Sequence, residues 1–211
     1  MSAMYDNFAK TFSESRHNHP WPELDAIIQD IKKHSFDSVL DIGCGNGRFL
    51  EEARKNEFIP HSYHGIDNSS GMIDEAKKSH PDYIFSVCPM ESMNIFPDMS
   101  FDAIILLASF HHLDTVIKRM ETLTECYRIL KEQGRIYITN WNLFENKELF
   151  ERYQDGYSGS GDFQIKIGEY DRYYHGFTLS ELTRLFRVND FHTERHEIFD
   201  WGKNIFSILH K

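Results

Sequence analysis

The sequence predicts a doubly wound α/β fold, in which helices cover both faces of a mostly parallel sheet of about seven strands. Three observations support this fold class. An apolar stretch that ends at Ile42 runs into a glycine-rich loop and then into a helix. Apolar, strand-like segments then alternate with helical ones up to residue 140. Two alternating segments, 193–199 and 204–209, predict an antiparallel C-terminal hairpin at the edge of the sheet.

The glycine-rich loop carries the most specific pattern in the chain. The stretch 39–50 reads VLDIGCGNGRFL, and its surroundings predict a strand over 36–42 and a helix over 48–56. Glycine allows a tight turn and lets a ligand lie directly on the backbone. The helix that follows offers unpaired N–H groups and the positive end of its dipole. The loop is therefore a candidate ligand site, and the alternative is a tight turn that binds nothing.

The spacing of the glycines excludes a dinucleotide fingerprint. That G-x-G-x-x-G pattern, counted from Gly43, would place its third glycine where Arg48 stands. The chain instead has an acid two residues before the first of three alternating glycines. The candidate cofactor-binding residues of this loop are Asp41, Gly43, Cys44, Gly45, Asn46 and Gly47.

A second acid ends the next predicted strand, over 62–66. Asp67 follows about 20 residues beyond the glycine loop, a position that faces the ribose of a bound nucleoside in a doubly wound sheet. A carboxylate there can accept hydrogen bonds from two hydroxyl groups. Asn68 and Met72 follow it and belong to the same candidate site. The alternative is that Asp67 only caps the helix that begins after Ser69.

The ends of the next two predicted strands complete the candidate cofactor site. The strand over 83–87 leads into a turn that we expect to lie along an adenine ring, with Met90 covering the ring and Glu91 near its amino group. The strand over 101–107 is a near-continuous apolar run, as in strands buried on both faces. Ala108 and Ser109 follow it and are included in the site.

Aromatic and imidazole side chains follow two of the predicted strands, at the edge where a second reactant would lie beside the cofactor. His111 and His112 are adjacent, and adjacent residues rarely form a metal site alone, so no metal is predicted. We expect one of them to line the pocket and the other to pack against or cap a helix over 114–130. Trp141, just after a strand over 134–139, is a further pocket candidate, although it could instead anchor the surface.

The chain is interpreted as one domain over residues 1–211. Residues 1–35 contain predicted helices over 4–13 and 24–31, which could lie across the carboxyl edge of the sheet as a lid. Residues 36–140 form the cofactor-binding core. Residues 141–211 form a substrate-side insert and the C-terminal hairpin.

The insert is predicted to be largely irregular. Residues 145–154 favour a short helix, and the glycine-rich, polar stretch 155–168 favours a mobile loop. Thr178 is the predicted cap of a helix that runs to residue 186.

Composition narrows the function classes. The chain has 211 residues and a net charge of −10, which counts against a broad electrostatic grip on nucleic acid. Its three cysteines are far apart, so neither a disulfide framework nor a cysteine metal site is expected. No apolar run approaches a membrane span, and the N-terminus lacks a signal-peptide pattern, which predicts a cytoplasmic protein.

With the acid at Asp41, the three glycines and the second acid at Asp67, the chain resembles the class I S-adenosylmethionine-dependent methyltransferases, which have a Rossmann-like fold. The resemblance implies that the loop holds the amino-acid half of S-adenosylmethionine and that S-adenosylhomocysteine is the product. The usual acid of the family beside adenine falls at Met90 here, so the adenine contacts depart from the family pattern.

Two outer segments are similar to one subfamily, the tRNA wobble-uridine methyltransferases, which convert 5-carboxymethyluridine to its methyl ester. One is the N-terminal run from Tyr5 through Arg16 to Pro22, and the other is the run DRYYH at 171–175. The closing strand at 204–206 also lies where these proteins end. The resemblance implies a tRNA substrate and, from the eukaryotic members, a small zinc-binding partner subunit.

The chemistry of such a reaction needs positioning more than proton transfer. A carboxylate has a reference pKa of about 4, so it is ionised at neutral pH and needs no general base. It needs a cation, and a guanidinium can hold it with two hydrogen bonds. Aromatic side chains could stack on the extruded base. The candidate catalytic residues are Arg16, Arg172, His111, Trp141, Tyr5, Tyr173 and His175.

Two other functions stay open on the sequence alone. A small-molecule O- or N-methyltransferase would need a base, for which His111, His112 or His175 would serve. A catalytically inactive scaffold would bind the cofactor and support a partner.

Overall fold

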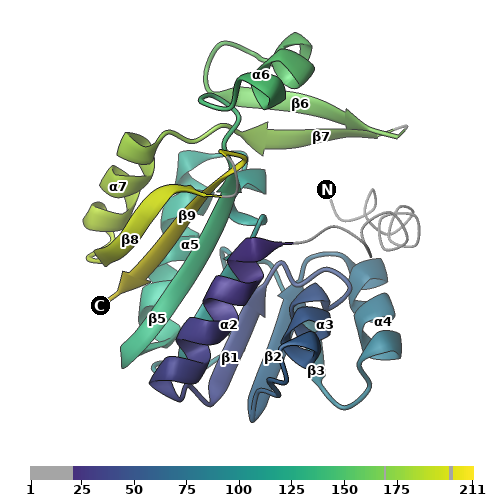
Figure 1. Cartoon of the computed structure of the whole chain (residues 1–211), viewed down its shortest axis with the longest axis vertical. Helices are drawn as coiled ribbons and strands as arrows, with labels where there is room; N and C mark the ends of the chain where they lie inside the picture. Colours follow the sequence, from purple (N-terminus) through teal and green to yellow (C-terminus); the bar gives the residue numbers. More distant parts are fainter. Residues whose placement is uncertain (1–20, 169, 200–201) are drawn as a thin grey trace.

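Seven strands form one sheet in the order β3-β2-β1-β4-β5-β9-β8 (Figure 1). The computed structural model describes residues 21–168, 170–199 and 202–211. Neighbouring strands from β3 to β5 pair in parallel, and β9 is antiparallel to both β5 and β8. The predicted fold class and C-terminal hairpin are therefore confirmed. The strands are β1 (Ser38–Ile42), β2 (Ser62–Asp67), β3 (Ile84–Val87), β4 (Phe101–Leu107), β5 (Leu130–Trp141), β8 (His192–Phe199) and β9 (Asn204–His210).

Helices cover both faces of this sheet, as the alternation of strands and helices predicts. One core contains the buried faces of α2 (Pro22–His34), α3 (Arg48–Lys55) and α4 (Ser70–Ser79). A second core on the other face contains those of α5 (Val116–Ile129) and α7 (Leu179–Val188). The strand order reverses between β1 and β4, which opens a crevice at their carboxyl ends.

Helix α2 is a layer of the core and does not lie across the sheet edge as a lid. Leu24, Ile27, Ile28 and Ile31 follow the i, i+3, i+4, i+7 spacing of an apolar helix face, and all four are fully buried. The predicted helix over 4–13 lies outside the described residues. No helix in the described part of the chain is long and apolar enough to cross a membrane.

The insert after β5 contains more regular structure than expected. The 155–168 segment, predicted to be a mobile loop, contains strand β6 (Asp162–Ile167), which pairs with β7 (Tyr170–His175) as a separate antiparallel sheet. The prediction was wrong there because Phe163 and Ile165 alternate with polar residues, a strand pattern that follows directly after the glycines.

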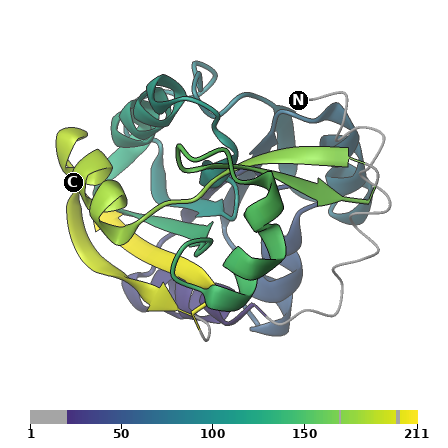
Figure 2. The same ribbon diagram turned by 90° about the horizontal axis from the view of Figure 1, so that it is seen from above.

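Short helices complete the insert, and its apolar side chains form a third, small core. These helices are α6 (Lys147–Tyr153) and η2 (Gln154–Gly156). Seen from above, the β6–β7 hairpin lies across the top of the main sheet (Figure 2). It contacts the short helix η1 (Phe110–His112) that follows β4. The hairpin therefore reaches the crevice from above.

Candidate active site

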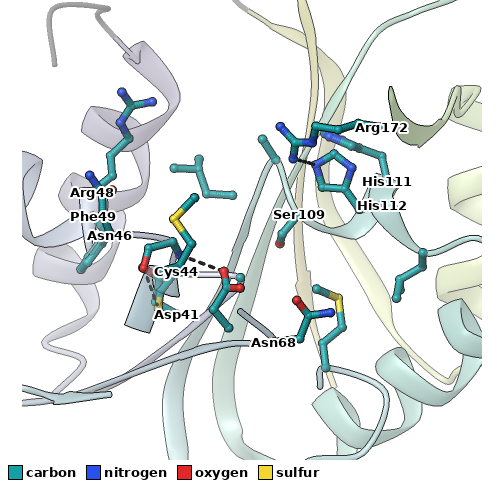
Figure 3. Close-up of a pocket in the computed structure, with 18 of the residues that line it drawn as sticks. Asp41, Cys44, Asn46, Arg48, Phe49, Asn68, Ser109, His111, His112 and Arg172 are labelled. Atoms are coloured by element: carbon teal, nitrogen blue, oxygen red, sulfur yellow. Dashed lines mark hydrogen bonds between the residues drawn. The ribbon is translucent and has the colours of Figure 1, made fainter. Parts of the chain in front are cut away.

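One cavity lies in this crevice and brings together most of the predicted site residues (Figure 3). Its volume is about 1410 Å³, including the part open to solvent. The glycine loop and the ends of β2 and β4 form one part, and η1, Trp141 and β7 form the other. The predicted residues that line it are Asp41, Gly43, Cys44, Gly45, Asn46, Asp67, Asn68, Met72, Met90, Glu91, Ala108, Ser109, His111, Trp141 and Arg172.

The glycine loop is held by backbone contacts that need glycine at its first position. The N–H groups of Gly43 and Cys44 both donate to the carbonyl of Ile66, at 2.8 and 2.9 Å. Gly43 has a φ of +72°, and a Cβ there would lie 2.4 Å from the Ser109 Cβ. Gly47 does not line the cavity. A Cβ at Gly47 would instead meet the ring of His80, so its glycine serves the packing of the loop.

Asp67 lies at the end of β2 with its carboxylate fixed by main-chain donors. Its Oδ2 accepts from the Gly45 N–H at 3.1 Å, and its Oδ1 accepts from the Ser69 N–H at 2.9 Å. Burial raises the pKa of Asp67 above its ordinary value, and these hydrogen bonds and the Arg172 guanidinium oppose that shift. Ser69, not Asp67, is the N-cap of α4, because its hydroxyl accepts from the Met72 N–H.

Asp41 is a second buried carboxyl group in the same part of the cavity. Its Oδ2 accepts a hydrogen bond from the Tyr63 hydroxyl at 2.9 Å. Burial raises the pKa of Asp41 to about 7, the Tyr63 hydrogen bond opposes the rise, and the nearby charge of Asp67 adds to it. Two carboxyl groups in one cavity favour a ligand that carries both a cation and hydroxyl groups.

These residues fit S-adenosylmethionine. A Cβ built on Gly45 would meet no atom within 4 Å, so open space lies directly over the backbone of the loop. Asp41 and Gly43 to Asn46 would hold the cationic amino-acid half, and Asp67 would hold the ribose. Met72 and Met90 offer apolar cover for the adenine ring.

The opposite part of the cavity presents a buried cation. Arg172 of β7 is 5% exposed, lies 5.4 Å over the ring of Tyr174, and its Nη2 is 2.9 Å from the Nε2 of His112. Figure 3 shows this pair across the cavity from Arg48. His112 Nδ1 lies 3.0 Å from the Tyr173 carbonyl. His112 therefore links the Arg172 guanidinium to the backbone of β7, the strand that carries Arg172.

Aromatic rings form a stack beside Arg172. Trp141 stacks on Tyr174 with ring centroids 4.9 Å apart, and on Tyr153 at 5.9 Å. His111 also stacks on Tyr174, with ring centroids 5.1 Å apart, and its ring centroid lies 6.1 Å from that of Trp141. Both His111 and His112 line the cavity, and neither caps α5, whose N-cap is Thr115. The expectation that one histidine packs away from the pocket was therefore wrong.

Tyr173 and His175 lie outside the cavity lining. The Tyr173 hydroxyl donates to Asp162 at 2.5 Å, and the Arg119 guanidinium donates to that hydroxyl at 3.0 Å. His175 lies between Asp162 and Glu181, at 2.7 and 2.9 Å. Residues on one face of β7 thus tie the hairpin to α5 and α7, while Arg172 and Tyr174 on the other face line the cavity. A direct contact of Tyr173 or His175 with substrate stays a prediction.

Several cavity residues were missed by the sequence reasoning. Tyr174 could have been found, because it alternates with Arg172 on one strand. Arg48 and Trp21 meet through a cation–π contact at 4.8 Å, which sequence spacing does not indicate. Tyr5 and Arg16 lie outside the described residues. Within the described ranges, no group of three or more histidine, cysteine or acidic residues is arranged to hold a metal ion.

Known proteins resemble this chain in sequence. Residues 40–138 match the family model described as a methyltransferase domain. A Xenopus tropicalis protein named tRNA (carboxymethyluridine(34)-5-O)-methyltransferase alkbh8 is 31% identical over 141 residues, which cover 66% of this chain and 20% of that protein. A putative methyltransferase of Encephalitozoon cuniculi is 27% identical over 207 residues, covering 92% of this chain and 90% of that protein.

A solved structure shares the fold over almost the whole chain. It is a complex between the Haloferax volcanii Trm112 methyltransferase activator and a putative methyltransferase. The matching chain has a TM-score of 0.66 and 18% identity, and the match covers 99% of this chain and 96% of that one. This likeness concerns the fold. The chain spans only 20% of the length of the Xenopus relative.

Proposed function

We propose that this chain, which belongs to the class I S-adenosylmethionine-dependent methyltransferases, acts on tRNA. Its substrate is the carboxylate of a wobble 5-carboxymethyluridine, which it converts to a methyl ester. The cofactor is S-adenosylmethionine, and S-adenosylhomocysteine is the product.

The hydrogen-bonding state of the two cavity histidines carries this proposal. A carbonyl only accepts, so the His112 Nδ1 that faces the Tyr173 carbonyl bears the hydrogen, and its Nε2 accepts from Arg172. The Nδ1 of His111 accepts from the Trp141 N–H at 3.4 Å, which puts its hydrogen on Nε2. Each neutral ring thus has its lone pair engaged, so neither imidazole is placed to take a proton from a bound substrate.

An acceptor that must lose a proton is poorly served by this arrangement. A phenol or an amine requires a general base within hydrogen-bond reach. A carboxylate is already ionised and requires a cation, which Arg172 supplies as a two-pronged donor. The site therefore favours a carboxylate over the acceptors of a typical small-molecule O- or N-methyltransferase.

The protein's part in the reaction is alignment. S-adenosylmethionine supplies a methyl group made electrophilic by its sulfonium. Arg172, held by His112, would orient the acceptor carboxylate, and the partly buried Trp141 in the cavity wall would contact the uracil ring. Holding both reactants in place is the main source of acceleration in such a displacement.

The known proteins support the RNA substrate and suggest a partner. The Xenopus relative is named for this uridine, and the Haloferax structure is a complex with a methyltransferase activator. We infer that a small activating subunit assists this chain. Because the net charge is −10, such a subunit could also supply cationic surface for tRNA.

The test is transfer of labelled methyl from S-adenosylmethionine to tRNA that carries 5-carboxymethyluridine, with and without an added activating subunit. We expect label that RNase renders acid-soluble and that mild base releases, because an ester hydrolyses and an N- or C-methyl group does not. Base-stable label would refute the ester. Label that RNase leaves unchanged, in a metabolite pool, would identify a small-molecule acceptor instead.

A further inference from the structure

Asp41 and Tyr63 form a buried pair below the glycine loop. Each residue is 3% exposed, and the Tyr63 hydroxyl donates to the Asp41 carboxyl at 2.9 Å. In the sheet register Tyr63 lies opposite Val39, two residues before Asp41, so the phenol reaches along the strand to the carboxyl group. The hydroxyl is thus directed at the acid that begins the cofactor loop.

No cation is hydrogen-bonded to Asp41 within the described residues. The ionisable groups that face the pair are Asp67 of β2, Cys44 of the loop and Tyr83 before β3. The cations of the cavity contact other groups: Arg48 lies over Trp21, Arg172 bonds to His112, and Lys118 pairs with Asp114. A buried carboxyl whose partners are a phenol, a thiol and another acid is more stable with its proton.

A ligand cation would reverse that preference. The amino-acid half of S-adenosylmethionine carries an ammonium group, and a cation near a carboxyl group favours its ionised form. We propose that binding of S-adenosylmethionine releases a proton from Asp41 to solvent, and that Tyr63 is the positioning residue that stabilises the carboxylate so formed. This coupling involves no acceptor, so it stands or falls independently of the tRNA proposal.

The proposal has a quantitative consequence for cofactor affinity. Burial raises the pKa of Asp41 to about 7 in the free protein. Where Asp41 is protonated, release of one proton makes Kd fall about tenfold for each unit rise in pH. The affinity should therefore rise about tenfold from pH 5 to pH 6 and level off above pH 7.5. The ammonium of the cofactor, with a reference pKa of about 8, adds a separate change only above that range.

The experiment is titration calorimetry of the whole chain with S-adenosylmethionine at pH 6.5, in phosphate and in imidazole buffer. These buffers differ in their enthalpy of ionisation, so a proton released on binding changes the observed heat. With a pKa of about 7 for Asp41, we expect roughly three quarters of a proton per cofactor bound. Equal heats in the two buffers, or no binding at any pH, would overturn the proposal.

Three variants separate this coupling from a purely structural role. Asp41→Asn should bind more weakly and release no proton. Tyr63→Phe keeps the ring against Phe49 and Phe85 but removes the donor, so the pH at which affinity levels off should move upward. Tyr83→Phe is the matched control, because Tyr83 packs edge-on against Tyr63 at 5.5 Å without bonding to Asp41. Identical pH profiles for Tyr63→Phe and Tyr83→Phe would remove Tyr63 from the mechanism.

Discussion

The two halves of the cavity differ in what holds them in place: backbone contacts in the cofactor half, and side chains from distant segments in the acceptor half. The cofactor half is centred on the short loop between β1 and α3, and backbone groups hold it: Gly43 and Cys44 donate to Ile66, and Asp67 accepts from Gly45 and Ser69. The acceptor half consists of side chains from η1, the end of β5 and β7, which are 30 to 61 residues apart. Local geometry fixes the first half, and tertiary packing fixes the second.

This difference implies that the halves respond differently to substitution. Changes in the cofactor half should alter cofactor affinity and fold stability together, because the same backbone serves both. Changes in the acceptor half should alter turnover and leave cofactor affinity almost unchanged.

The largest expected effect is on the pH dependence of stability in the cofactor half. The folded pKa of Asp41, about 7, lies above its unfolded value of about 3.9. Its contribution to stability is fully present below pH 3.9 and is lost as pH rises through 7. The cost above pH 7 is at most about 4 kcal/mol. Asp41→Asn should therefore gain stability over the wild type at pH 8 and not at pH 4, as measured by urea unfolding. An equal difference at both pH values would contradict the assignment.

In the acceptor half, Arg172→Ala should lower kcat/KM about 100-fold, because a charge-assisted grip is worth about 1.5–3 kcal/mol. Cofactor Kd, measured by calorimetry, should change less than about twofold. Arg172→Lys is the control: it keeps the charge but loses the two-pronged geometry, so its activity should be intermediate. A comparable loss of cofactor affinity would erase the distinction between the halves.

Gly43 and Gly45 offer a matched pair within one loop. Both have positive φ, but a Cβ at Gly43 would meet Ser109, whereas a Cβ at Gly45 would meet nothing within 4 Å. Gly43→Ala should lose about 2–3 kcal/mol of stability and most cofactor affinity, and Gly45→Ala about 1 kcal/mol of stability. Thermal unfolding compares them, and equal losses would show that steric contact with Ser109 is unimportant.

The smallest expected change in stability comes from removing a helix cap, and each half of the cavity offers one such cap. Asn146 caps α6, which carries the stacked Tyr153, and Ser69 caps α4 beside Asp67. Replacing either residue by alanine should cost about 1 kcal/mol. Asn146→Ala should reduce turnover more than cofactor affinity, and Ser69→Ala should do the reverse. Steady-state kinetics with calorimetry would distinguish the two patterns.

The same difference explains what could be predicted from the sequence. The strands, the loop and the place of Asp67 follow from local periodicity and glycine spacing, so the fold class and most residues that line the cofactor half of the cavity could be predicted. The tautomers of His111 and His112 depend on Trp141 and the Tyr173 carbonyl, which only the fold brings near. The β6 strand was hidden among glycines, and no local signal places Arg48 beside Trp21.

The insert between β5 and α7 has a small core of its own, around Leu143, Phe163, Ile165 and Tyr174. It leaves the main sheet after Trp141, and the chain rejoins the Rossmann-like frame at α7. Such a segment can accumulate substitutions, or be exchanged whole for that of a relative, while the cofactor loop keeps its geometry. Acceptor preference in this architecture is therefore free to diverge faster than cofactor use.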